Sequence, residues 1–180
     1  MCKKFSFVSF TLLFSLLLGC FEEVADLSNP KTYNSNQIFF KYPRNWEITD
    51  DTFIPAIHNL LIETPGDALV ILQSYQADLA QDLESFSKSF SEDTLLETPV
   101  GRISKSEFEP LSKEEGFEWV EENFEISILS ESIPHKRTYG TTKIADRQVF
   151  LIFQVASEDH SKAEPGFNLI RNSLRASELK

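Results

Sequence analysis

Residues 148–156 read "QVFLIFQVA", a run with apolar side chains at both alternating sets of positions. A strand with one wet face alternates apolar and polar residues, whereas a strand covered on both faces is apolar throughout. The run therefore predicts a central strand packed on both sides. "HKRTYGTTKI" at 135–144 precedes it, so Ala145-Asp146-Arg147 should join the two stretches as an antiparallel hairpin.

Other strands are predicted upstream of this pair. "LLIETP" at 60–65 and "LVILQSY" at 69–75 flank Pro65-Gly66-Asp67, a strong hairpin signal. "QIFFKYPRNWEI" at 37–48 alternates as a strand as far as Pro43, where the ring fixes the backbone for a turn. Residues 100–108 carry only weak strand markers, whereas 116–129 predict a longer strand in which Phe124, Ile126 and Ile128 alternate cleanly.

Two helices are predicted from apolar residues that recur every three or four positions. Asp78 is the expected cap of the first helix, whose apolar stripe is Leu79, Leu83, Phe86 and Phe90. Ser161 is the expected cap of the second, whose stripe is Phe167, Ile170 and Leu174. Pro165 would be tolerated only in a first turn. This order of elements predicts an α+β fold, a mainly antiparallel sheet flanked by helices as an α/β/α sandwich.

The chain resembles the PsbP-like (Mog/PsbP-type) group, which has this α/β/α sandwich. The resemblance covers about residues 36–175 and is carried by "NQIFFKYPRNWEI", the Pro-Gly hairpin at 65–66, the helix at 79–90, "VFLIFQV" and "FNLIRNSL". It implies a non-enzymatic module that binds a ligand or partner. None of the group's metal ligands is carried over to this chain.

The first twenty residues predict where the protein resides. Lys3 and Lys4 precede fourteen mostly apolar residues at 5–18, too few for a bilayer span of about 20 but suited to the core of a signal peptide. "LLGC" at 17–20 resembles the lipobox of bacterial lipoproteins. That resemblance implies cleavage between Gly19 and Cys20, a diacylglyceryl group on the Cys20 thiol, and an N-acyl chain such as palmitate. An uncleaved N-terminal anchor with a buried Cys is the alternative.

This processing would bind the chain to a lipid bilayer through Cys20, since a second acyl chain makes a marginal anchor stable. Phe21 stands where an inner-membrane lipoprotein tends to carry Asp. In a Gram-negative host the resemblance therefore favours the outer membrane, facing the periplasm. The chain would divide into a signal peptide (1–19), the lipidated Cys with a flexible tether of about 20 Å (20–35), and a globular domain (36–177).

Charge and cysteine content exclude several classes of function. Loss of Lys3 and Lys4 would change the net charge from −11 to −13, which disfavours a nucleic-acid partner. Cys2 leaves with the signal and Cys20 carries lipid, so no thiol remains for a disulfide, a zinc site or a nucleophile. No cofactor is predicted beyond the covalent lipid.

The acidic stretch "KEEGFEWVEENFE" at 113–125 is the candidate surface for an unknown envelope protein, with Glu115, Glu118, Trp119 and Glu122 as its possible contact residues. Strand alternation would put Trp119 on one face and Glu118 and Glu122 on the other. A solvated edge that resists strand pairing is the simpler interpretation. Trp119 would be the main anchor of any interface.

No motif of a known hydrolase, metalloprotease or nucleotide-binding site is present. A small envelope hydrolase would need His58 or His135 beside a Ser and a carboxylate in a deep pocket. Weak Ca²⁺ binding by the acidic stretch at 113–125 is a further alternative, although no EF-hand-like spacing supports it. "EDH" at 158–160 could be a metal cluster, or a solvated loop before a helix. Tyr42 and Trp46 are expected to form a core corner and not a ligand platform. The sequence favours a membrane-anchored binding, scaffold or assembly-assisting protein.

Overall fold

The computed structural model describes residues 23–54, 56–97, 102–111, 116–128 and 130–177. The predicted signal, Gly19, Cys20 and Glu115 lie outside these ranges. Within them, no helix has both the length and the apolar character needed to span a bilayer.

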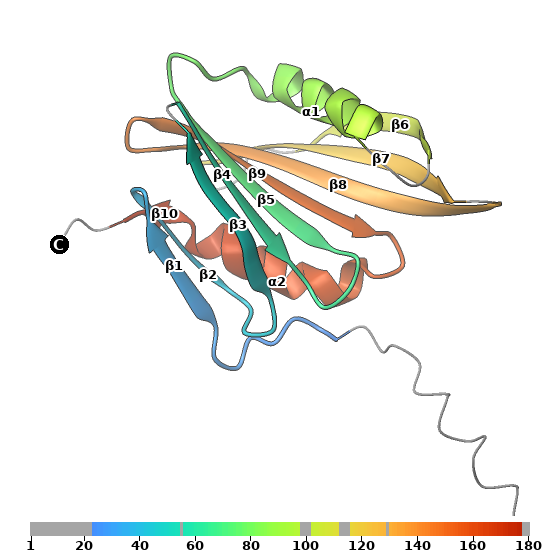
Figure 1. Ribbon diagram of the computed structural model, residues 1–180, viewed down its shortest axis with the longest axis horizontal. Helices are drawn as coiled ribbons and strands as arrows, with labels where there is room; N and C mark the ends of the chain where they lie inside the picture. Colours follow the sequence, from blue (N-terminus) through green and yellow to red (C-terminus); the bar gives the residue numbers. More distant parts are fainter. Residues whose placement is uncertain (1–22, 55, 98–101, 112–115, 129, 178–180) are drawn as a thin grey trace, which may run out of the picture.

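One antiparallel sheet forms the centre of the molecule (Figure 1). Its strands are β3 (Glu47–Ile54), β4 (Ile57–Glu63), β5 (Leu69–Gln76), β6 (Arg102–Pro110), β7 (Glu118–Ile128), β8 (Glu131–Ile144) and β9 (Arg147–Ala156). They lie in the order β3-β4-β5-β9-β8-β7-β6. Both predicted hairpins, β4–β5 and β8–β9, are confirmed. The stretch 148–156 is the central strand, and Leu151 and Ile152 are fully buried on its opposite faces.

The two faces of this sheet are covered differently. Helix α1 (Leu83–Glu97) packs over β7 and β8 on one face. On the other face lie α2 (His160–Ser173) and a small sheet of β1 (Lys31–Ser35), β2 (Ile38–Tyr42) and β10 (Arg175–Ala176), in the order β1-β2-β10 (Figure 1). The α+β sandwich predicted from the sequence is confirmed, with the small sheet as an addition.

The predicted caps of both helices were wrong. Asp82, not Asp78, caps α1, because its Oδ1 accepts the Ser85 backbone N–H at 2.9 Å. Residues 76–79 form a separate turn, which leaves Leu79 outside the helix. Helix α2 begins at His160, since the Asp159 carbonyl oxygen accepts the first helical N–H groups. Pro165 therefore lies two residues further into α2 than predicted.

The prediction of a flexible tether was wrong for residues 23–35. Ala25 is buried, and its N–H donates to the Lys162 carbonyl oxygen of α2 at 3.2 Å. The Asp26 N–H donates to Asn45 Oδ1 at 2.9 Å. β1 pairs with β2 along its whole length and buries Tyr33. Backbone hydrogen bonds thus fix a segment that composition alone made look like a linker.

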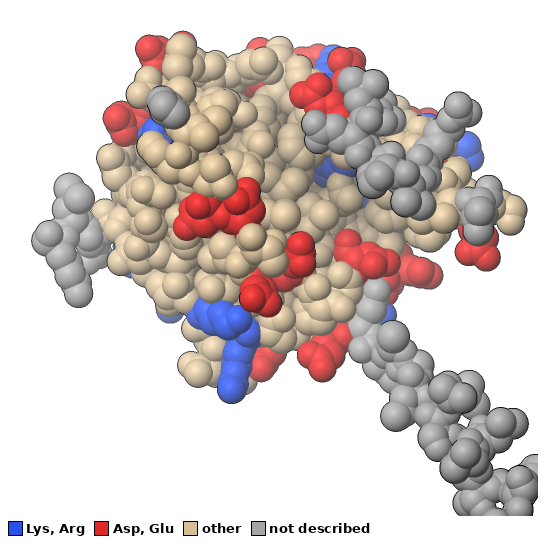
Figure 2. Space-filling model, in the orientation of Figure 1, with Lys and Arg blue, Asp and Glu red and all other residues tan. Residues whose placement is uncertain are grey.

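Trp46 forms the core corner predicted for it, between β2 and β3. Its side chain is 1% exposed and meets Phe167 of α2 edge to face, with ring centroids 5.7 Å apart. Tyr42 is half-buried against the same cluster. The surface outside the core is acidic, and Figure 2 shows acidic side chains spread over the face with fewer basic ones.

Gly166→Ala should destabilise the protein although Gly166 lies inside α2. In an ordinary helix this change gains about 1 kcal/mol. Here a Cβ would overlap the Trp46 ring and lie 2.8 Å from Pro43 Cγ. Overpacking of a filled core costs about 1–3 kcal/mol, so this cost should exceed the gain in helix propensity. Urea unfolding should show a lower free energy of unfolding; an increase would contradict this account of the corner.

Candidate functional site

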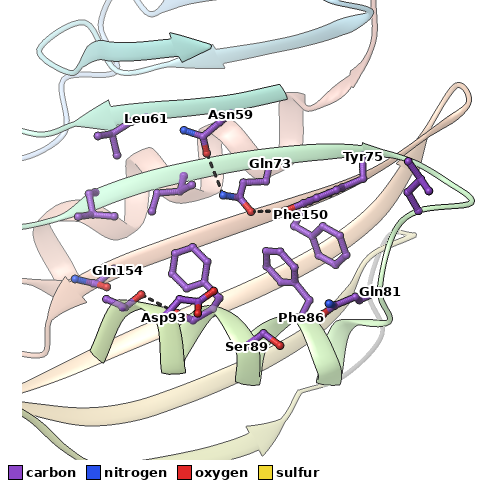
Figure 3. A pocket seen from close by; sticks show the side chains of 15 residues that line it. Asn59, Leu61, Gln73, Tyr75, Gln81, Phe86, Ser89, Asp93, Phe150 and Gln154 are labelled. Carbon is purple, nitrogen blue, oxygen red and sulfur yellow. Dashed lines mark hydrogen bonds between the residues drawn. The ribbon is translucent and has the colours of Figure 1, made fainter. Parts of the chain in front are cut away.

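A groove of about 670 Å³ lies beside α1, on the half of the sheet that the helix leaves uncovered (Figure 3). β4, β5 and β9 form its floor, and α1 with the loop before it forms a wall. Small-molecule sites commonly have volumes of about 300–1,000 Å³. The groove is therefore large enough to hold a ligand of that kind.

Strand register arranges the groove floor in rows. Leu61, Ile71 and Ile152 are paired across the three strands, and Asn59, Gln73 and Phe150 form the next row. Alternate residues of a strand face the same side. The intervening side chains, such as Leu60 and Leu72, point into the α2 layer and are buried there. The groove-facing side chains of β4 and β5 are only half-buried.

Aromatic rings form the apolar wall of the groove. Phe86 of α1 stacks on Phe150, with centroids 3.8 Å apart and an interplanar angle of 11°. The Tyr75 ring meets both rings edge-on, at 6.3 Å and 5.8 Å. Phe90 continues this wall one turn along α1. An apolar or aromatic ligand would find a rigid surface here.

A chain of hydrogen bonds crosses the groove floor. Asn59 Nδ2 donates to Asp50 Oδ2 at 2.9 Å, and Gln73 Nε2 donates to Asn59 Oδ1 at 3.0 Å. The Tyr75 hydroxyl donates to Gln73 Oε1 at 2.8 Å. Hydrogen bonds from Thr52 and Asn59 hold the pKa of Asp50 below its ordinary value. Burial raises the pKa of Tyr75, so the chain runs from a carboxylate to a neutral phenol.

A buried ion pair lies under α1, next to the groove. Arg137 Nη1 donates to Glu122 Oε2 at 2.9 Å, and both side chains are 0% exposed. The hydroxyls of Ser91 and Ser106 donate to Glu122 Oε1 at 2.5 Å and 2.6 Å. The Tyr139 hydroxyl donates to Glu122 Oε2 at 2.6 Å, and burial raises its pKa. Every oxygen of this carboxylate is thus satisfied.

This cluster corrects the predicted partner surface. Glu122 is fully buried, because α1 covers the strand face that the sequence suggested was solvated. Trp119 is 6% exposed and lies on the α2 side, stacked between Phe117 and Phe153. Trp119 and Glu122 lie on opposite faces of β7, as predicted, but neither residue can anchor a surface contact. Of the predicted contact residues that the structure describes, only Glu118 is exposed.

The two histidines of the hydrolase hypothesis do not line the groove. His58 is fully buried, with Nε2 2.7 Å from Asp51 Oδ1 and 3.3 Å from the Tyr33 hydroxyl. His135 stacks on Phe124, and its Nδ1 lies 2.9 Å from the Ile133 carbonyl oxygen. It borders a hollow of about 220 Å³ with Ser157. Both residues are described by the structure, and no hydrogen bond joins the His135 side chain to Ser157.

The "EDH" stretch belongs to the start of α2. Asp159 occupies the N-cap position, and Lys162 Nζ lies 2.7 Å from its Oδ1. In the part of the chain that the structure describes, no three His, Cys, Asp or Glu side chains lie close enough to share a metal ion.

Deprotonation of Tyr33 should lower the free energy of unfolding at alkaline pH. Burial and the nearby Asp51 charge raise the pKa of Tyr33 from 10.0 to about 12. The unfolded chain releases this proton near pH 10 while the folded chain keeps it. The stabilisation is therefore complete below pH 10 and is lost as the pH rises toward 12. Tyr33→Phe should flatten this part of the decline in unfolding free energy; an unchanged slope would contradict the assignment.

Comparisons with known proteins concern the fold. No family model and no curated protein sequence matches this chain. The solution structure of cyanobacterial PsbP (CyanoP) from Synechocystis sp. PCC 6803 is 11% identical, with a TM-score of 0.55, over 82% of this chain and 92% of that one. LpqN, involved in cell envelope biogenesis of Mycobacterium tuberculosis, is 12% identical with a TM-score of 0.42, over 83% and 91%. The chain therefore has a PsbP-like fold.

Proposed function

We propose that this PsbP-like domain is a lipid-anchored, non-enzymatic binding module of the bacterial cell envelope, which holds a small apolar ligand in the groove beside α1. The groove is the observation that carries the proposal. Its volume of about 670 Å³ suits a small molecule, and its floor and wall combine aliphatic and aromatic side chains with a few amides. Apolar walls with few polar groups are typical of ligand sites.

The anchor at Cys20 would place one end of the groove near the bilayer. Three residue steps separate Cys20 from Glu23, and such a stretch spans at most about 10 Å. Glu23 borders a small hollow together with Gly66 and Asp67 of the β4–β5 turn. Leu61 and Leu69 lie at this end of the two strands, so this end of the groove would face the membrane. A ligand could then pass directly from the lipid phase.

The anchor is tested by Cys20→Ser. The wild-type protein should carry diacylglyceryl and N-acyl mass on a chain that begins at Cys20, and should float with vesicles in a density gradient. The variant should lose the acyl mass and the cleavage. A variant cleaved at the same bond and equally membrane-bound would exclude lipidation as the anchor.

The groove is tested by filling it. Ser89 is exposed on α1 and lines the groove, whereas Glu92 is exposed on the same helix outside it. Organic extracts of protein purified from cell membranes should contain a small apolar molecule in the wild type and in Glu92→Trp. Ser89→Trp should lack it at equal folded yield. Equal amounts of this molecule in all three proteins would contradict binding in the groove.

A further inference from the structure

We infer, on the basis of the function proposed above, that Gln154 determines which polar head the groove accepts. The side-chain amide of Gln154 presents an N–H donor to an uncharged oxygen, the carbonyl or hydroxyl oxygen of an amphipathic ligand such as a monoacylglycerol. Gln154 lies on β9 at one end of the groove (Figure 3). Its cross-strand neighbour on β5 is Leu69.

Arg137 fixes the orientation of this amide. Arg137 Nε and Nη2 donate to Gln154 Oε1 at 2.8 Å and 2.6 Å. A guanidinium group only donates, so the atom that faces it must be the amide oxygen. The NH₂ group of Gln154 is left on the side away from Arg137, and Gln154 is half-buried among the groove residues. Among the described residues, this nitrogen donates to no acceptor.

The ion pair also makes the amide a stronger donor. Two charge-assisted hydrogen bonds to one carbonyl oxygen draw electron density from the amide nitrogen. Arg137 is fully buried, so water does not compete for this interaction. Glu122 neutralises the guanidinium charge at 2.9 Å. The groove therefore receives a polarised neutral donor and not a net positive charge.

The charges around the groove favour an uncharged head. Asp93 is the only charged side chain among the described residues that line the groove, and the chain as a whole carries a net charge of −11. A carboxylate or phosphate head would be repelled by Asp93 and would meet no cation among the described lining residues. The next row of the floor, Leu61 and Ile71, is aliphatic. A neutral head at Gln154 would thus leave an acyl chain on an apolar surface.

Photolabelling of the full chain in phosphatidylcholine vesicles tests this assignment. The probes are a diazirine-bearing monoacylglycerol, the fatty acid of the same chain length, and the corresponding alkane. Labelled positions on α1 and β5 are read by mass spectrometry, and half-saturation is compared between variants. Gln154→Glu keeps the acceptor for Arg137 but removes the donor, and Gln154→Met removes the donor without adding charge. Gln76→Glu adds the same charge at an exposed site outside the groove.

The wild type should label with the monoacylglycerol at lower concentration than with the fatty acid. Both Gln154 variants should raise half-saturation by the monoacylglycerol about tenfold, the effect of one hydrogen bond, and leave labelling by the alkane unchanged. Gln76→Glu should behave as wild type. If the Gln154 variants keep wild-type half-saturation while Ser89→Trp abolishes labelling, the groove binds but Gln154 does not select. If the wild type labels no more than Ser89→Trp, the binding function itself is excluded.

Discussion

Replacing Arg137 by methionine is expected to lower the free energy of unfolding by about 3–5 kcal/mol. Arg137 and Glu122 are both fully buried, and the substitution removes the guanidinium that balances this carboxylate. Methionine fills much of the volume but donates no hydrogen bond. The cost is that of a buried carboxylate without a counter-charge, together with an unpaired Gln154 oxygen. Urea unfolding followed by circular dichroism measures it.

Two further variants separate charge from packing. Lys136 directly precedes Arg137 on β8, and its ion pair with Glu121 is partly exposed. Lys136→Met should therefore cost less than about 1 kcal/mol. Glu122→Gln combined with Arg137→Met should recover part of the loss, because it removes the isolated charge. A single Arg137→Met variant as stable as wild type would show that the pair is not required.

Trp46→Ala is expected to cost about 3–5 kcal/mol, the range for truncating a fully buried aromatic side chain. The ring is 1% exposed and lies between Phe167 and the backbone of Gly166. The same substitution should reverse the effect of Gly166→Ala, because the added methyl group would then enter the vacated space. In a double-mutant cycle the two changes should couple strongly. Additive effects would contradict direct contact between Trp46 and Gly166.

Much of the fold could be predicted from local patterns. The apolar run at 148–156 identified the central strand, and Pro65-Gly66-Asp67 identified a hairpin. Errors occurred where a local signal competed with a tertiary one. Asp78 and Asp82 both suit a helix cap, and only the turn at residues 76–79 decides between them. Residues 23–35 have no clear periodicity, and the hydrogen bonds from α2 and β2 that order this segment cannot be predicted from its own sequence.

The candidate site could not be predicted from the sequence, because the groove arises from where α1 lies. Asn59 and Gln73 look like ordinary polar residues on a wet strand face. Their environment depends on a helix that covers β7 and β8 but stops short of β4 and β5. One signal was present. Arg137 alternates with His135 and Tyr139, and an Arg on an inward-facing row indicates a buried acidic partner.

Photocrosslinking in living cells tests the binding function most directly. Benzoylphenylalanine would replace Ser89, inside the groove, or Glu92, outside it on the same helix. After irradiation, the intact mass of the purified protein shows what each position has captured. We expect a discrete small-molecule adduct at position 89 and none at position 92. Identical adduct patterns at the two positions, or no small-molecule adduct at position 89, would contradict ligand binding in the groove beside α1.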